Sequence, residues 1–152
     1  MTRFNHLCVS QDHALCRAIT NANNALANGI AQRLFRGNLL RLWEGACAVT
    51  GVREPRVLRS SHIKPWAEAT VQEKVDHFNG LLLVPNLDSL FNEGLISFKN
   101  DGRMLVSTDW RPDDQRRMHV TTELHLRSVH AESQPYLEFH RDVLFERLSK
   151  TA

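Results

Sequence analysis

The chain of 152 residues contains 42% hydrophobic and 24% charged residues, which is typical of one soluble globular domain with a buried core. Its longest apolar runs are far too short to cross a membrane, and its first ten residues lack the apolar region of a signal peptide, so we expect a cytoplasmic protein without a membrane partner. Three separated cysteines without a Cys-x-x-Cys pair argue against a disulfide framework and a structural zinc knuckle.

The net charge of +2 is unremarkable, but its distribution along the chain is uneven. Between Arg33 and Lys64 there are seven basic residues and only two acidic ones, a local balance of +5. Such a stretch is a plausible binding surface for a phosphate backbone. The alternative is a solvated helix face followed by a strand edge.

The first part of the chain predicts two helices, over 12–28 and 30–43, separated at Gly29. Asp12 would cap the first helix. The expected inward residues are Ala14, Leu15, Ala18, Ile19, Ala22 and Leu26 in the first helix and Ile30, Leu34, Leu39, Leu40 and Trp43 in the second, with Arg33, Arg36 and Arg41 facing outward.

The middle of the chain predicts short strands over 47–49, 56–60 and 81–84, with His62 just after the second. Pro85 would begin a helix that ends at Gly94. On that helix Asp88 and Asn92 are four residues apart and therefore share one face.

The last third predicts a hairpin of strands over 95–98 and 104–107, because Asp-Gly is a strong turn signal. A charged connector follows from Trp110. Pro135 would open a final amphipathic helix. Its apolar stripe would be Tyr136, Phe139, Val143, Leu144 and Leu148.

We therefore expect a single α+β domain with three parts: a helical arm over 1–29, a core over 30–108, and a connector with a C-terminal helix over 109–152. Within the core, two strands and a helix would bring His62, Asn79 and Asp88 together. A neutral imidazole can take a proton from water. A carboxylate suits Mg²⁺ or Mn²⁺, and a carboxamide can fix a loop or lend an oxygen to a metal.

Each of the three residues also has a purely structural interpretation. His62 could be a satisfied histidine at a strand end, Asn79 with Gly80 could be a turn, and Asp88 could cap the helix after Pro85. Trp66 is expected in the core.

The segments Cys-Ala-Val-Thr-Gly (47–51), Ser-Ser-His-Ile-Lys-Pro-Trp (60–66) and Asn-Gly-Leu-Leu-Leu-Val-Pro-Asn-Leu-Asp-Ser-Leu-Phe-Asn-Glu-Gly (79–94) resemble the HNH endonucleases. The resemblance is to the branch found in bacterial restriction and defence proteins. It covers roughly 30–107, and residues 136–141 also look similar. It implies a ββα-metal core and metal-dependent hydrolysis of DNA phosphodiester bonds.

The resemblance also implies a role for each matching residue. His62 would be the general base, and Asn79 would hold the catalytic loop and so orient His62. Asp88, with Asn92 one turn later, would bind one divalent ion, Mg²⁺ or Mn²⁺ first, with Zn²⁺ or Ni²⁺ as alternatives. The basic stretch, independently of the resemblance, predicts that the DNA backbone is contacted by Arg33, Arg36, Arg41, Arg56, Arg59 and Lys64. Arg141 and His140 could also contact phosphate, or they could lie on a solvated helix face.

Two rival interpretations stay open. Ser61 and Asn92 stand where many relatives have stronger metal ligands, which is compatible with a nucleic-acid-binding module that has lost catalysis. A nuclease toxin or effector with an immunity partner is the other. A homodimer or a separate specificity partner is compatible with all of these hypotheses.

Overall fold

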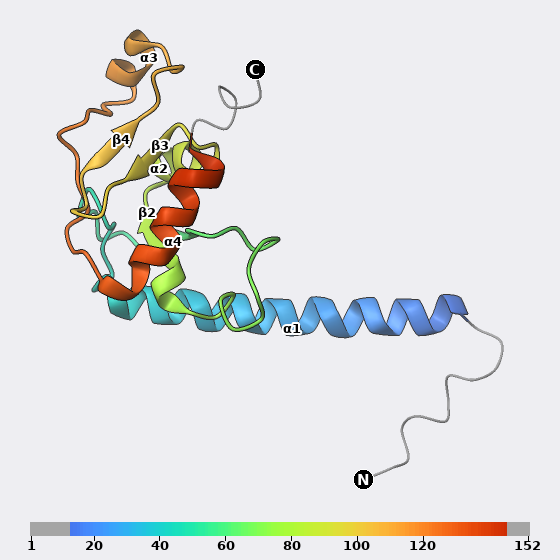
Figure 1. Cartoon of the computed structure of the whole chain (residues 1–152). Coiled ribbons are helices and arrows are strands. Elements are labelled where there is room, and N and C mark those ends of the chain that lie inside the picture. The colour runs from blue at the N-terminus through green and yellow to red at the C-terminus, as the bar shows by residue number, and fades with distance from the viewer. Residues whose placement is uncertain (1–12, 146–152) are drawn as a thin grey trace.

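The computed structural model describes residues 13–145, and its first element is the 30-residue helix α1 (His13–Leu42). This helix lies along one side of the domain and extends well beyond it (Figure 1). The prediction of two helices is wrong, because α1 continues through Gly29. Glycine costs only about 1 kcal/mol relative to alanine inside a helix, and the surrounding alanine, leucine and arginine residues favour helix.

The apolar face predicted for the first helix is exposed. Ile19, Leu26, Ile30 and Leu34 are 52%, 62%, 45% and 58% accessible, so the expected inward positions of Ile30 and Leu34 are also wrong. Leu39 and Trp43 are buried as predicted. The predicted cap Asp12, the side chains of Ala14 and Leu15, and Leu148 lie outside the part that the structure describes.

A two-stranded antiparallel sheet and a helix follow α1. Strand β1 (Arg59–His62) pairs with β2 (Gly80–Leu83), so that His62 lies opposite Gly80 and Ser61 opposite Leu81. The 3-10 turn η1 (His77–Asn79) precedes β2, and α2 (Pro85–Asn92) follows it. The helix begins at Pro85 as predicted. The strand predicted over 56–60 is shifted to 59–62, so His62 is the last residue of β1 and does not follow the strand.

The strand predicted over 47–49 is not formed. These residues make turns, held by hydrogen bonds from the Cys47 amide to Val52 O and from the Ala48 amide to Leu82 O. The free thiol of Cys47 is buried. The segment therefore covers the edge of β2 without extending the sheet.

The predicted hairpin is confirmed as β3 (Ile96–Phe98) paired with β4 (Met104–Val106). The charged connector contains the short helix α3 (Pro112–Arg117). The chain then forms the 3-10 turn η2 (Ala131–Ser133), the helix α4 (Gln134–Phe139) and the π-helical turn η3 (His140–Leu144). Within residues 13–145 no helix is both long and apolar enough to span a membrane.

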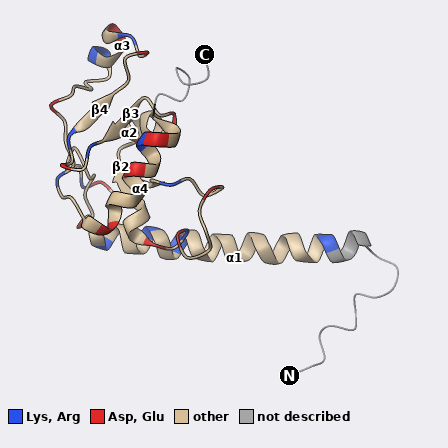
Figure 2. Cartoon of the chain, viewed as in Figure 1, with Lys and Arg blue, Asp and Glu red and all other residues tan. Residues whose placement is uncertain are grey.

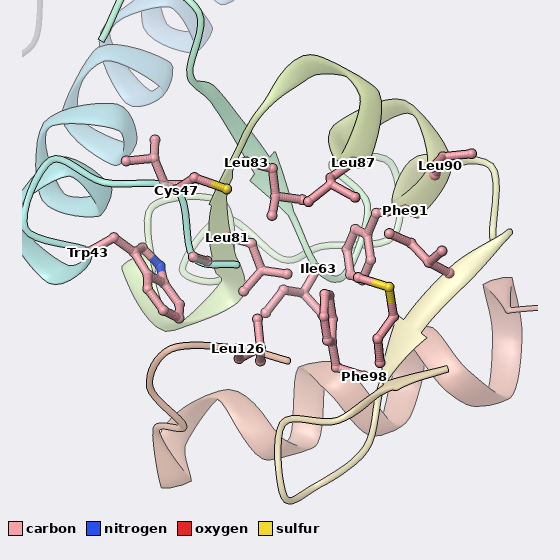
Figure 3. Packing of buried hydrophobic residues seen from close by; sticks show 14 of the residues in the cluster. Trp43, Cys47, Ile63, Leu81, Leu83, Leu87, Leu90, Phe91, Phe98 and Leu126 are labelled. Carbon is pink, nitrogen blue, oxygen red and sulfur yellow. The ribbon is translucent and has the colours of Figure 1, made fainter. Parts of the chain in front are cut away.

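One core joins these elements. Leu81 and Leu83 of β2, Leu87 and Phe91 of α2, and Phe98 of β3 pack together, with Trp43 at the end of α1 closing one side (Figure 3). The predicted stripe of the last helix needs correction, since its buried residues are Leu137 and His140, whereas Val143 is 45% exposed. His140 is part of the core and is not on a solvated face.

Candidate active site

The imidazole of His62 is held on three sides. Its ring is stacked on Phe35 of α1, with centroids 3.8 Å apart and planes 10° apart, and the Trp66 ring meets it edge-on at 5.5 Å. Its Nε2 lies 3.0 Å from the main-chain oxygen of Lys74. A carbonyl oxygen can only accept, so Nε2 carries the proton and Nδ1 holds the lone pair of the neutral ring.

The surroundings of His62 favour the neutral ring. Burial lowers the pKa of His62 below 6.5, and the hydrogen bond to Lys74 O raises it by a smaller amount. Charging a buried imidazole requires it to give up hydration, which is the physical reason for the lowering. His62 is therefore a neutral proton acceptor at pH 7.

Asn79 is fully buried at the end of η1 and ties together the loop between β1 and β2. Its Oδ1 accepts from the Lys64 amide at 2.8 Å, and its Nδ2 donates to Lys64 O at 3.3 Å and Glu73 O at 3.1 Å. Glu73 precedes the residue whose carbonyl bonds His62. Asn79 thus bonds residues near both ends of the loop. A residue that served only to form a turn with Gly80 would not make these contacts.

The loop has two further fixed points. Lys64 Nζ bonds both carboxylate oxygens of Glu73 at 2.8 and 2.9 Å, which lowers the pKa of Glu73. The Tyr136 hydroxyl donates to Asp76 at 2.7 Å, and burial together with that carboxylate raises the pKa of Tyr136. The path of the loop is therefore fixed from within and by α4.

A second group of polar side chains lies on the other face of β1. Asn92 Nδ2 donates to Asp88 Oδ1 at 3.1 Å, and the buried Ser61 hydroxyl lies 3.5 Å from Asn92 Oδ1. Successive strand residues point to opposite faces, so Ser61 faces α2 while His62 faces α1. Asp88 is not a cap, because the N-cap of α2 is Val84, without a side-chain bond.

The oxygens of Asp88, Asn92 and Ser61 are a donor set suited to a hard divalent cation. Only one of the three side chains is a carboxylate, so the set would bind such a cation weakly. Residues 13–145 contain no group of three His, Cys, Asp or Glu side chains that could hold a metal. The set fits a weakly held Mg²⁺ or Mn²⁺ better than Zn²⁺ or Ni²⁺. No hydrogen bond in the described part joins His62 to Asp88 or Asn92.

A cleft of about 450 Å³ opens beside His62. Its lining comprises Gln32, Phe35, Arg36, Leu58, Arg59, Ser60, His62 and Trp66, none of which is acidic. Trp66, expected in the core, is half-buried and forms part of this wall. A basic cleft beside a neutral imidazole is suited to a phosphate group.

Arg36 and Arg59 are the predicted phosphate-contacting residues that the fold brings to this cleft. The Arg36 guanidinium donates to Pro55 O at 2.8 Å, Leu58 O at 3.0 Å and Ser60 Oγ at 3.1 Å. Arg36, expected to face outward, is therefore half-buried and docks α1 onto the segment that leads into β1. None of these three hydrogen-bond partners of Arg36 is a carboxylate. The Arg59 side chain is exposed.

The other predicted basic residues are dispersed over the surface. Arg33 is exposed on α1, Arg41 bonds Asn38, and Arg56 pairs with Glu54 at 2.8 Å. Lys64 is paired with Glu73. Arg141 donates to Phe98 O at 2.8 Å and Asn100 Oδ1 at 2.7 Å, far along the chain from the His62 cleft.

His140, considered above as a phosphate contact, is a structural residue. Its ring is stacked on Phe91 at 3.7 Å, Nε2 lies 2.9 Å from Phe91 O, and Nδ1 lies 2.9 Å from Ser97 Oγ. Burial lowers the pKa of His140 to about 4. A neutral ring that donates through Nε2 and accepts at Nδ1 satisfies both bonds.

Sequence reasoning missed Phe35, Gln32 and the carbonyl of Lys74 as parts of the site. Phe35 and Gln32 are 27 and 30 residues before His62, and each looks like an ordinary helix residue. A main-chain oxygen leaves no residue-type signal at all. The sequence pattern can place Phe35 on an apolar helix face, but it cannot show that the Phe35 ring contacts His62.

Three comparisons with known proteins bear on this geometry. Residues 47–99 match the family model described as HNH endonuclease, which confirms the resemblance over that segment. A solved structure described as a modification-dependent TagI restriction endonuclease is similar, with a TM-score of 0.50 and 20% identity over 70% of this chain, and this likeness concerns the fold alone. The matched region spans 36% of that longer chain. No curated protein matches.

Proposed function

We propose, on the premise that residues 47–99 form an HNH endonuclease segment, that this protein is a metal-dependent endonuclease that hydrolyses DNA phosphodiester bonds. The observation that carries the proposal is the placement of the His62 ring, which is bonded through Nε2 to Lys74 O and stacked on Phe35 at a basic cleft. The solved restriction endonuclease of similar fold supports a role in restriction or defence. Residues 30–108 would form the catalytic core, with 1–29 as an arm.

His62 acts as the general base. With Nε2–H engaged by Lys74 O, the lone pair at Nδ1 takes a proton from a water molecule as that water attacks phosphorus. Stacking on Phe35 and the edge contact with Trp66 restrict ring rotation, so little orientational entropy is lost when the water is engaged. Asn79 is a positioning residue, because it acts on His62 through the loop main chain.

Asp88, Asn92 and Ser61 would hold the divalent ion through oxygen atoms. Such an ion supplies positive charge to the phosphate oxygens and the leaving oxygen as negative charge develops there. Asn92 currently donates its amide to Asp88, so its Oδ1 is already oriented toward Ser61. Arg36 and Arg59 would hold the adjacent backbone phosphates in the cleft.

The test begins with plasmid cleavage by wild type, His62→Ala and His125→Ala in Mg²⁺ or Mn²⁺. His125 is an exposed histidine outside the cleft, so its variant serves as the matched control. Loss of the base should lower the rate 10²- to 10⁴-fold, whereas the control should cleave like wild type. Equal cleavage by wild type and His62→Ala would remove His62 from the base role.

The metal assignment is tested separately by Mn²⁺ titration calorimetry. Asp88→Ala should abolish binding and cleavage together, because it removes the single carboxylate of the set. His62→Ala should keep Mn²⁺ binding while losing cleavage. Retained Mn²⁺ binding in Asp88→Ala would place the metal elsewhere, and absence of wild-type cleavage with Mg²⁺, Mn²⁺, Zn²⁺ and Ni²⁺ would reject the enzyme.

Two observations favour a second candidate, a nucleic-acid-binding module of the same fold without catalysis. Asp88 accepts a hydrogen bond from Asn92, and Asp88 is the single carboxylate of the donor set. Such a module would bind duplex DNA equally well with chelator and would give no Mn²⁺ heat. A nuclease would bind Mn²⁺ and cleave. Duplex binding in chelator and Mn²⁺ titration calorimetry, together with the cleavage assay, therefore distinguish the two candidates.

A further inference from the structure

The exposed part of α1 carries a line of polar side chains that ends at the cleft of His62. Its members, which we call the amide stripe, are Arg17, Asn21, Asn24, Asn28 and Gln32. They recur at intervals of four, three, four and four residues, so they share one face of the helix. All five are exposed, and Gln32 lines the same cleft as His62.

The same face of α1 becomes apolar where the helix meets the domain. Phe35 and Leu39 continue the spacing of the amide stripe by three and four residues, and both are fully buried. Phe35 is the residue on which His62 stacks. The stripe therefore points to the side of α1 on which the domain and its cleft lie.

The opposite face of α1 has different chemistry. Leu26 and Phe35 are nine residues apart, which is 900° at 100° per residue, so they point in opposite directions. Ile19 and Ile30 lie on the Leu26 side. Of the five asparagine and glutamine residues between Arg17 and Arg33, four therefore lie on the side of the domain, whereas Asn23 lies off this face and Arg33 lies on the Leu26 side.

The absence of acidic residues from α1 and the length of the stripe both suit a nucleic acid on this face. Helix α1 contains four arginines and no aspartate or glutamate, and its charges leave the stretch between Arg17 and Arg33 neutral (Figure 2). Carboxamides bond base edges, adenine above all, and phosphate oxygens. From Gln32 to Arg17 the stripe runs for roughly 22 Å, about six base pairs of a duplex.

We propose that the amide stripe is a binding surface for the DNA duplex flanking the scissile phosphate, continuous with the His62 cleft through Gln32. This inference rests on the proposed function for its substrate. It assigns the part of α1 outside the domain to substrate binding. The four amides of the stripe carry no charge, so they add contacts along a groove without adding counterion release, and only Arg17 would add an ionic contact.

The test compares two pairs of charge insertions with the same spacing. Asn24→Glu with Asn28→Glu puts two carboxylates on the stripe, whereas Asn23→Glu with Ala27→Glu puts them one residue earlier, about 100° around the helix. All four positions are exposed, so neither pair disturbs the core. Circular dichroism at 222 nm checks that both variants keep their helix.

Binding of a fluorescent 30-base-pair duplex is measured by anisotropy in chelator, which requires no cleavage. The stripe pair should raise the Kd at least tenfold and the control pair less than threefold.

Each outcome decides between the two proposals. Equal weakening by both pairs, or no weakening by the stripe pair, would overturn the stripe while leaving a cleaving enzyme in place. Wild type that binds and discriminates the pairs but never cleaves would reject the endonuclease and support the stripe. Wild type that does not bind duplex DNA at all would overturn both.

Discussion

The rings of His62 and Phe35 are stacked with their centroids 3.8 Å apart, so one face of the proposed base is covered by a residue of α1. Phe35 is fully buried, and its ring also lies against the backbone at Gly80, the strand partner of His62. This contact joins the helix that leaves the domain to the residue that would carry out the chemistry. The protonation of His62 therefore depends on how α1 is docked.

The acid limb of kcat/KM should lie below pH 6.5. Protonated His62 cannot accept a proton, and burial lowers its pKa, so inactivation moves to more acid pH than for a free imidazole. In Phe35→Leu the ring becomes more hydrated, and the limb should move back toward 6.5. A wild-type limb at or above 6.5, or one that Phe35→Leu leaves unchanged, would contradict this account of the base.

Replacing Asn79 by alanine should lower both stability and activity. The variant leaves the Lys64 amide and two carbonyls without their partners, which should reduce the unfolding free energy by roughly 2–4 kcal/mol. Urea titration checks this value. Asn86→Ala, at an exposed position of α2, is the control and should change stability by less than about 0.5 kcal/mol.

If the role of Asn79 is only structural, the pKa of His62 should be the same in folded Asn79→Ala as in wild type. If Asn79 positions the loop, Lys74 O moves away in Asn79→Ala, and the hydrogen bond that raises the pKa of His62 is weakened. The His62 pKa from NMR titration should then fall further. An unchanged His62 titration in the folded variant would limit Asn79 to a structural role.

Gly94 and Gly37 should respond in opposite directions to alanine. Gly94 follows α2 with φ of +72°, and a Cβ there would lie 2.1 Å from the Leu144 carbonyl oxygen, so Gly94→Ala should destabilise by roughly 3 kcal/mol or more. Gly37 lies inside α1 with nothing within 4 Å of an added Cβ. Gly37→Ala should stabilise by about 0.5–1 kcal/mol in thermal unfolding, and a loss of stability there would contradict the packing of α1.

Stability should fall as the solution is acidified through the range of His140. The folded pKa of about 4 lies below the unfolded value of 6.5, so the contribution of this residue is complete above pH 6.5 and is lost as pH falls toward 4. The shift corresponds to roughly 3 kcal/mol. Urea unfolding of wild type and His140→Gln from pH 7 to 4 should show a shallower decline in the variant, and parallel declines would contradict the prediction.

Local signals in the sequence predicted the elements that position the site. The continuous apolar run before Pro85 predicted β2, Pro85 predicted the start of α2, and Asp101-Gly102 predicted the β3–β4 hairpin. In each case a residue with restricted or special backbone preferences marks the boundary. The resemblance to HNH endonucleases then supplied the candidate roles of His62, Asn79 and Asp88.

The remaining features depend on contacts distant in sequence. Gly29 suggested a break, but α1 continues because a single glycine costs less than the neighbouring turns contribute. His140 looked like a polar surface residue until Ser97 and Phe91, more than 40 residues away, supplied both of its hydrogen bonds. The contact with His62 is made by the main-chain carbonyl of Lys74, so it cannot be predicted from the type of residue at that position.

The hydrogen bond between His62 Nε2 and Lys74 O has a consequence for which sequence changes this loop can tolerate. Between Trp66 and Gln72 the loop takes no direct part in holding the Nε2 proton, since the contacts to His62 and Asn79 are made by the main chain of Lys64, Glu73 and Lys74. Side chains at the loop tip, such as the exposed Val71, can therefore be exchanged with little effect on the base. Sequence change between these positions would therefore leave the orientation of the His62 ring unchanged, because the atoms that hold it belong to the main chain on either side.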